Sequence, residues 1–323
     1  MNDILPRRRF STIQDWHNFV PELVQHEQAA TWINQLRWSC YLDIERLRGR
    51  PLLVYATKFP VSHPAAPTSI DHSDIDGFTD LVQSVDPSHE AVDVLIHSLG
   101  GNPEATERIV FILRSRFKQV NFLVPHSAFS AATMLALSGN EIVLHPVASL
   151  GPIDPQINGI PARSIRRGFD RVRELLKEQG PEALPAYLPL IEKHSLEVLE
   201  ICDDSLNLSR ELVTQWLQKY MFEGEDAAPL IEAAVAFFSD YDTHKTHGRP
   251  LTYDKLETLN LKISIADPSL SALMREIHII LIGFLDITTF VKIFENGRGL
   301  SWGRQFEMQP IMVQASPGPQ PSS

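Results

Sequence analysis

The sequence predicts an α/β fold in which parallel βαβ units are followed by a largely helical second half. Between residues 92 and 144, short apolar runs alternate with a helical pattern, and the connections between them are short. Such an alternation is typical of parallel strands joined by crossover helices. After residue 151 the apolar residues return mainly at three- and four-residue spacing, which indicates helices.

The segment before the alternating region is expected to contain one long helix and one strand. Apolar residues three and four positions apart predict a helix over Trp16–Leu47, with Gly49 as its stop signal. The short apolar run Pro51–Ala56 predicts a strand. The proline-rich stretch from 60 to 67 predicts a loop.

The alternating region itself divides into strands and helices. Its strands are short runs rich in branched aliphatic residues. Pro103 suits the first turn of its first helix, and Gly139 ends its second helix. The expected elements are strands at 92–97, 120–124 and 141–144, and helices at 103–117 and 131–137.

Helices are expected over most of the remaining chain, at 163–222, 230–238 and 269–295. The most apolar stretch, 277–294, contains His278, Asp286 and Lys292. A membrane span needs about 20 residues almost free of charge. We therefore expect a buried or oligomer-facing helix and no membrane span. Residues 314–323 are rich in Pro and Ser and are expected to form a disordered tail.

Composition and charge exclude several classes of function. The chain is 43% hydrophobic and 21% charged, as ordinary soluble globular proteins are. Its net charge of −11 argues against nucleic-acid binding, which needs a surplus of Lys and Arg. Cys40 and Cys202 lie far apart and indicate neither a disulfide framework nor a zinc site. The N-terminus lacks the apolar segment of a signal peptide, so a cytoplasmic location is expected.

Two turns at the ends of predicted strands carry the residues of greatest chemical interest. Gly100 and Gly101 follow one strand, and Ser130 follows the next strand and opens a helix. Open α/β sheets bind their ligands at the carboxyl ends of parallel strands. Glycine lets backbone N–H groups approach a ligand, and such amides can stabilise an oxyanion. The hypothesis is a nucleophilic Ser130 with the N–H groups of Gly101 and Ala131 as oxyanion donors.

Each of these features has an ordinary explanation when it is taken alone. A double glycine is a common turn, and a serine before a helix is commonly a plain N-cap. The two features lie one βα step apart, at the ends of strands expected to be adjacent. This pairing is what favours a catalytic site.

Three runs of the sequence resemble the serine dehydrogenase proteinase family, in the family's order and spacing. They are Leu95–Gly101, Val124–Thr133 and Leu150–Gln156. These are Clp-fold serine peptidases, related to SppA-type signal peptide peptidases and Clp protease. The resemblance implies a ClpP/crotonase-type fold of repeated ββα and βαβ units. It suggests a catalytic domain at 51–265 between helical segments at 1–50 and 266–313.

The resemblance also implies a catalytic triad in the chain order Ser, Asp, His. Ser130 matches the nucleophile. Asp154 falls where Clp proteases place their catalytic histidine, which makes it the candidate acid. His247 is the candidate base and His244 the second candidate. Lys177 would be the base if the site were a Ser–Lys dyad, as in SppA-type relatives.

Other residues near the matched motifs have open roles or depart from the family pattern. His97 and His126 flank the expected site; each is commonly a satisfied strand-end histidine, and both could line the pocket, as could Gly100. The family usually has Thr-Pro before the glycine pair, where this chain has Ser98 and Leu99. None of these departures removes a reacting group.

The expected function is that of a serine peptidase acting on short peptides or unfolded protein through an acyl-enzyme on Ser130. A homo-oligomer is expected, without a cofactor, a metal or a nucleic-acid partner. One alternative is a crotonase-like acyl-CoA enzyme, which uses two oxyanion amides without a serine nucleophile. Another is a catalytically silent scaffold of the same fold.

Overall fold

The computed structural model describes residues 7–307 except 62, 64, 193–194 and 196. At its centre lies a seven-stranded sheet with the strand order β10-β5-β3-β2-β1-β11-β12. The first five of these strands run parallel, and they include the three strands between residues 91 and 144 that were predicted to be parallel. The last two are antiparallel to their neighbours. The strands are β1 (Leu52–Thr57), β2 (Ala91–His97), β3 (Gln119–Val124), β5 (Glu141–Leu144), β10 (Ile263–Ile265), β11 (Phe290–Asn296) and β12 (Ser301–Gln305).

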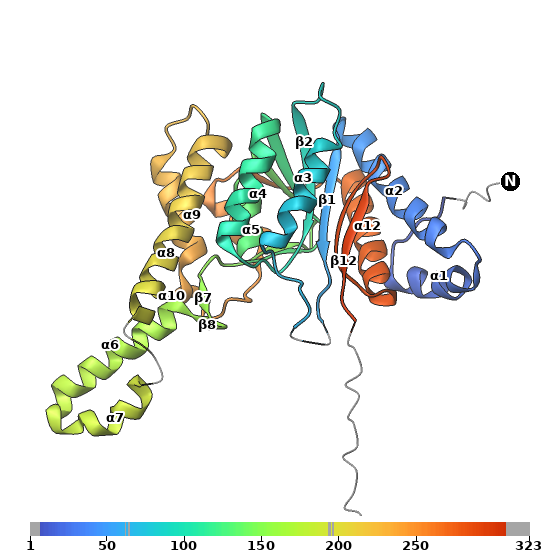
Figure 1. Ribbon diagram of the computed structural model, residues 1–323. Helices are drawn as coiled ribbons and strands as arrows, with labels where there is room; N and C mark the ends of the chain where they lie inside the picture. Colours follow the sequence, from blue (N-terminus) through green and yellow to red (C-terminus); the bar gives the residue numbers. More distant parts are fainter. Residues whose placement is uncertain (1–6, 62, 64, 193–194, 196, 308–323) are drawn as a thin grey trace, which may run out of the picture.

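Side chains that alternate along the strands form two hydrophobic cores, one on each face of the sheet. On β2, Val94 and Ile96 belong to the first core and Leu95 to the second. The first face is covered by α3 (Ile75–Gln83), α4 (Pro103–Arg116) and α5 (Ala131–Leu137), and the second by α2 (Ala29–Arg48) and α12 (Pro268–Ile287) (Figure 1). Burial on both faces explains why the parallel strands are almost continuously apolar in sequence.

The helical second half extends the first core and also builds an arm. The helices α8 (Glu197–Trp216) and α9 (Ala228–Ser239) pack onto the first core. In contrast, α6 (Ala162–Gln179) and α7 (Leu184–Ile191) project from the body of the molecule (Figure 1). The shorter helical elements are η1 (His72–Asp74), η2 (Pro181–Ala183), η3 (Leu217–Met221), α10 (Tyr241–His244), α11 (Tyr253–Leu256) and η4 (Glu257–Leu259).

Two small sheets lie beside the central sheet. The first, in the order β4-β6-β9, is formed by β4 (Ser127–Ala128), β6 (Ser149–Leu150) and β9 (Leu251–Thr252). The second is a hairpin of β7 (Gln156–Ile157) and β8 (Ile160–Pro161) at the root of α6. Because β4 and β6 flank the turns after the main strands, the first small sheet supports the residues predicted to be functional.

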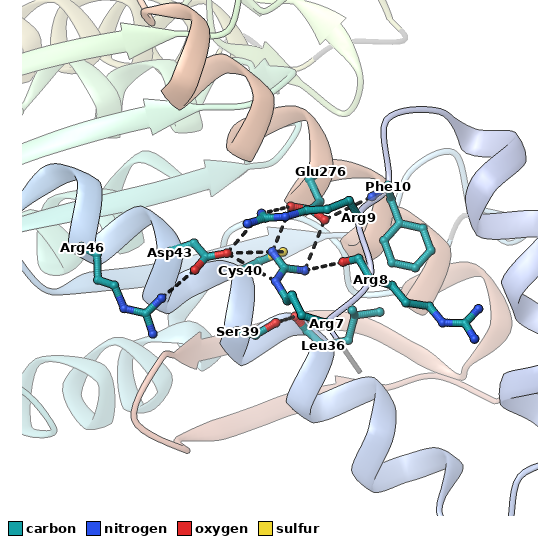
Figure 2. Close-up of polar contacts among 10 residues, drawn as sticks. All are labelled: Arg7, Arg8, Arg9, Phe10, Leu36, Ser39, Cys40, Asp43, Arg46 and Glu276. Carbon is teal, nitrogen blue, oxygen red and sulfur yellow. Dashed lines mark hydrogen bonds and ion pairs between the residues drawn. The ribbon is translucent and has the colours of Figure 1, made fainter. Parts of the chain in front are cut away.

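The N-terminal helix is interrupted, where one continuous helix was predicted. The chain forms α1 (Ile13–Gln25) and then α2, because His26 is extended and caps α1 with its N–H. Ahead of α1, Arg7 and Arg9 both form ion pairs with the buried Glu276 of α12, at 3.0 and 2.8 Å (Figure 2). Arg7 also pairs with Asp43 of α2 at 2.9 Å. These ion pairs fasten the N-terminal segment to both helices of the second face.

The last predicted helix is too long, because it was expected to reach residue 295. It ends at Ile287, and Thr288 is extended with φ −126° and ψ 170°. The following residues form the β11–β12 hairpin, which completes the central sheet. Both faces of β11 are buried, and its Lys292 pairs with Asp74 at 2.8 Å, so no simple alternation of polar and apolar residues announces the strand.

The apolar helix at 277–294 was expected to be buried or to face another subunit. Most of its part within α12 is buried against α1, α2 and the sheet, and Ile287 at the end of the helix is 42% exposed. Among the described residues, no helix combines the length and apolarity needed to cross a membrane. The tail predicted at 314–323 lies outside the described residues.

Candidate active site

Ser130 lies in a tight turn between β4 and α5. Its φ of 53° and ψ of −124° place it in a region that residues with a side chain rarely adopt. Such a conformation costs about 1–3 kcal/mol and persists only where the surrounding structure enforces it. The next residues of α5, Ala131 and Ala132, are small and buried, which lets the helix begin directly after the turn. A strained serine between a strand and a helix is typical of nucleophiles that must stay accessible.

The turn with the glycine pair is bound directly to the Ser130 turn. The Ser98 N–H donates to the Ser127 carbonyl, and the Phe129 N–H donates to the Ser98 carbonyl, both at 3.0 Å. Gly100 has φ +93°, and a Cβ there would lie 2.3 Å from the Phe129 carbonyl oxygen and 2.7 Å from the Ala131 nitrogen. Only glycine therefore fits at position 100.

The amides of the two turns differ in what they bind. The Gly100 N–H donates to Ser98 Oγ at 3.1 Å. Gly101 lies against Ile70, whose N–H donates to the Gly100 carbonyl at 2.8 Å. Within the described part of the chain, the Gly101 and Ala131 N–H groups have no hydrogen-bond partner. Gly101 lines the cavity described below, whereas Ala131 is 1% exposed and is not among the residues that line it.

Asp154 and His247 form a hydrogen bond, with 3.0 Å between His247 Nδ1 and Asp154 Oδ1. The Asp154 side chain is 1% exposed and the His247 side chain 20% exposed. Asp154 Oδ2 is buried without a hydrogen-bond partner among the described residues. When Nδ1 donates to a carboxylate, the neutral ring keeps its Nε2 as an acceptor. The pair can thus present a base toward whatever His247 faces.

Ser130, the glycine turn and His247 line one cavity of about 340 Å³. Its apolar wall is formed by side chains from α5, α8 and the loop after β6, and several hydroxyl groups complete it. The sequence analysis did not predict these lining residues, because no motif contains them. They are Met134, Ile153, Leu208, Thr68, Ser69, Ser205 and Ser209. The described contacts include no hydrogen bond between Ser130 and His247, and such contacts are often loose until substrate binds.

The family model for ClpP-like SDH-type serine proteinases matches residues 74–278, well over half of the chain. The chain belongs to this family. The matched range contains Ser130, Asp154 and His247, and membership implies the ClpP/crotonase fold that the sequence predicted.

Two relatives are themselves uncharacterized. The uncharacterized protein MJ1495 of Methanocaldococcus jannaschii is 25% identical over 235 residues, which is 72% of this chain and 73% of that protein. The uncharacterized protein MJ0137 of the same organism is 26% identical over 183 residues, or 56% of each chain. Neither name states an activity, so the role of the site in this chain is argued from its own geometry.

His97 and His126 do not line the Ser130 cavity. They line a second cavity of about 320 Å³, together with His278 from α12. The cause is strand alternation: His97 shares a face of β2 with Leu95, which points toward α2 and α12. The His278 ring lies 4.8 Å from the His97 ring and 4.7 Å from the His126 ring, measured between centroids.

The three histidines share the second cavity with Lys58 and Asp286, and burial lowers the pKa of all three imidazoles. Burial lowers the pKa of His97 well below its usual value, and the neighbouring His278 and His126 lower it further. Burial likewise lowers the pKa of His278 to about 3, with contributions from His126, Arg275 and His145. The three rings are therefore neutral near pH 7.

The other two candidate bases also lie away from the Ser130 cavity. His244 is 3% exposed, and its Nε2 lies 2.6 Å from the Phe237 carbonyl oxygen, as expected for a buried structural histidine. The next residue, Lys245, has a left-handed backbone with φ 67°. His247, two residues further along the chain, lines the Ser130 cavity. Lys177 lies in the last turn of α6, exposed on the arm, so the dyad alternative has no support in the fold.

Proposed function

We propose that this ClpP-like proteinase hydrolyses peptide bonds through an acyl-enzyme on Ser130, with His247 as base and Asp154 as the residue that orients it. The observation that carries the proposal is the single cavity lined by Ser130, His247 and Gly101, with Asp154 hydrogen-bonded behind the histidine. The family's description as serine proteinases supports the reaction class.

In the first half of the reaction, Ser130 Oγ attacks the carbonyl carbon of the substrate while His247 Nε2 takes the hydroxyl proton. The negative charge that develops on the carbonyl oxygen is bound by the N–H groups of Gly101 and Ala131. The C–N bond then breaks, His247 returns the proton to the leaving amine, and the acyl group remains as an ester on Ser130.

In the second half, water replaces the amine. His247 removes a proton from the water as its oxygen attacks the ester carbonyl, and the same two amides bind the oxyanion again. The C–O bond to Ser130 breaks, the serine recovers its proton from His247, and a carboxylic acid leaves. Asp154 holds the imidazole in the tautomer that has a free Nε2 and stabilises the imidazolium between these steps.

The test compares hydrolysis of fluorogenic peptides and of nitrophenyl esters by the wild type, Ser130→Ala and Ser205→Ala. Ser205 lines the same cavity and serves as the matched control. We expect Ser130→Ala to lose hydrolysis by several orders of magnitude and Ser205→Ala to stay within a few-fold of the wild type. Thioester or enoyl-CoA turnover that survives Ser130→Ala would instead identify an acyl-CoA enzyme. A folded wild type that acts on none of these substrates would indicate a silent scaffold.

We also propose that the protein forms a homo-oligomer through its arm. Apolar side chains that are exposed there include Leu184 and Leu188 of α7, at 37% and 39%, and Ile160 beside the root of α6, at 45%. Exposed apolar surface of this kind is typical of contacts between subunits.

A further inference from the structure

One acidic residue, Glu104, is among the residues that line the Ser130 cavity. Glu104 lies in the first turn of α4, directly after the glycine turn and Pro103, and it lines the same cavity as Ser130 and His247. Among the described residues that line this cavity, Glu104 and His247 have the ionisable side chains, and neither Lys nor Arg contributes. Asp154, behind His247, adds a second carboxylate near the same space.

Glu104 is an exposed residue, and its side chain has no ion pair or hydrogen bond within the described part of the chain. A glutamate in the first turn of a helix has a purely structural explanation, because it complements the helix dipole. That explanation applies equally to a carboxylate that faces bulk solvent, and it does not account for a position inside the cavity of a nucleophile. An unpaired anion there attracts a cation that enters with the substrate.

We infer that Glu104 selects substrates with a positively charged group in the acyl part, such as a lysine side chain next to the scissile carbonyl. This inference rests on the proposed function, because it assigns the substrate class of the same site. Glu104 is a specificity-determining residue in this account: it takes part in no bond-making step and acts by binding the cation. Since the carboxylate is exposed, its effect has the size of one solvent-accessible ion pair, about three- to fivefold in kcat/KM.

The test uses the p-nitrophenyl esters of Nα-acetyl-lysine and Nα-acetyl-norleucine, two acyl groups with the same four-carbon side-chain stem that differ by the side-chain ammonium group. Hydrolysis by Ser130→Ala is subtracted as background. The wild type is expected to prefer the lysine ester, with a lysine-to-norleucine ratio of kcat/KM that falls as NaCl is raised, because salt screens exposed charges.

Two variants and a matched control isolate the carboxylate. Glu104→Gln should lower the lysine-to-norleucine ratio of kcat/KM about three- to fivefold. Glu104→Lys should lower it further and make the norleucine ester the better substrate. Glu107→Gln removes the same charge one turn further along α4, where the side chain is exposed but does not line the cavity, so its ratio should equal that of the wild type.

The outcomes separate this inference from the proposed function. If the wild type hydrolyses both esters in a Ser130-dependent way and the ratio is the same in all four proteins, the role of Glu104 is refuted and the hydrolase survives. Equal losses in Glu104→Gln and Glu107→Gln would likewise refute it, since they would reflect the overall charge of α4. If the wild type hydrolyses neither ester above the Ser130→Ala background, both proposals fail together.

Discussion

At Gly100, two separate requirements act on one residue. The backbone has φ +93°, and the position of a Cβ is already occupied by the Phe129 carbonyl and the Ala131 amide. Gly159, in the turn between β7 and β8, has a similar φ of +80° but nothing within 4 Å of its Cβ position. The two glycines therefore allow backbone strain to be separated from close approach.

The first prediction concerns Gly100→Ala, compared with Gly159→Ala. Both variants should lose about 1–2 kcal/mol of stability from the left-handed backbone. Gly100→Ala should also displace the Ser130 turn and lower kcat by about 10²-fold or more, since a displacement of about 1 Å can have that effect. Thermal unfolding and ester hydrolysis measure the two effects. A Gly100→Ala enzyme as active as Gly159→Ala would show that the close packing of the two turns has no role in catalysis.

The second prediction concerns Asp154→Asn. The amide keeps the shape of the side chain but can no longer fix the His247 tautomer, so kcat should fall on the order of 10³–10⁴-fold. The control is Asp242→Asn, which removes an exposed carboxylate that pairs with Arg163 and Arg167 on the arm. Its kcat should match the wild type. Equal activity of all three proteins would remove Asp154 from the mechanism.

Local sequence predicts only those parts of the site that consist of residues next to one another in the chain. The glycine pair and Ser130 could be predicted because each follows a strand, and the motif fixes their spacing. Asp154 and His247 came from the family resemblance, because nothing local links two residues that the chain folds together over 93 positions. The position of His97 was predictable from strand alternation, which assigns it to the face opposite the first core.

Among the elements, α12 contributes His278 to the second cavity, and protonation of this buried ring is expected to lower the stability of the fold. Its His278 lies within ring contact of His97 and His126, and His145 and Arg275 also disfavour its protonated form. Its folded-state pKa of about 3 lies below the usual 6.5, so the unfolded chain binds more protons between these values. The contribution of the neutral His278 ring to the free energy of unfolding is therefore complete above about pH 6.5. It is lost as the pH falls toward 3.

The third prediction is that His278→Leu makes the free energy of unfolding less dependent on pH below pH 6.5. Between pH 6.5 and 4.5 the wild type should lose about 2–3 kcal/mol more than the variant, at 1.36 kcal/mol for each pKa unit. Urea unfolding at each pH measures the slope. His17→Leu, which removes an exposed histidine from α1, should keep the slope of the wild type. A wild-type slope in His278→Leu would mean that the ring is charged in the folded protein at these pH values.

At the same scale, helices with a clear pattern were predictable and the sheet edge was not. The helix over residues 131–137 and the strand over 141–144 have the predicted bounds. The β11–β12 hairpin was missed because its first strand is as apolar as the helix before it. The break before α2 was missed because the apolar spacing continues across it, and local capping by His26 ends α1.

For the whole molecule, the two cavities lie on opposite faces of the sheet. Ser130 and the glycine turn lie on the face covered by α4 and α5, whereas the histidine cavity lies on the face covered by α12. The arm of α6 and α7 leaves the body beside the Ser130 face (Figure 1). This arrangement leaves the arm free to contact another copy without covering either cavity within its own chain.

The fourth prediction is that sedimentation velocity detects an oligomer that depends on the arm. The double variant Leu184→Glu/Leu188→Glu places charges on the exposed apolar side of α7 and should sediment as a smaller species than the wild type. The control Leu47→Glu changes an equally exposed leucine, 46% exposed, at the end of α2 and should keep the wild-type assembly. A monomeric wild type, or a double variant that still assembles, would contradict the proposed subunit contact.

The central claim is that one strained serine is the nucleophile and that His247 activates it. Peptide mapping by mass spectrometry after reaction with a fluorophosphonate tests this most directly, because the reagent forms a phosphorus–oxygen bond to an activated serine with loss of fluoride. The predicted result is a single adduct on the peptide that contains Ser130, formed much more slowly in His247→Ala. A wild type that stays unmodified, or an adduct on any other serine, would contradict the account.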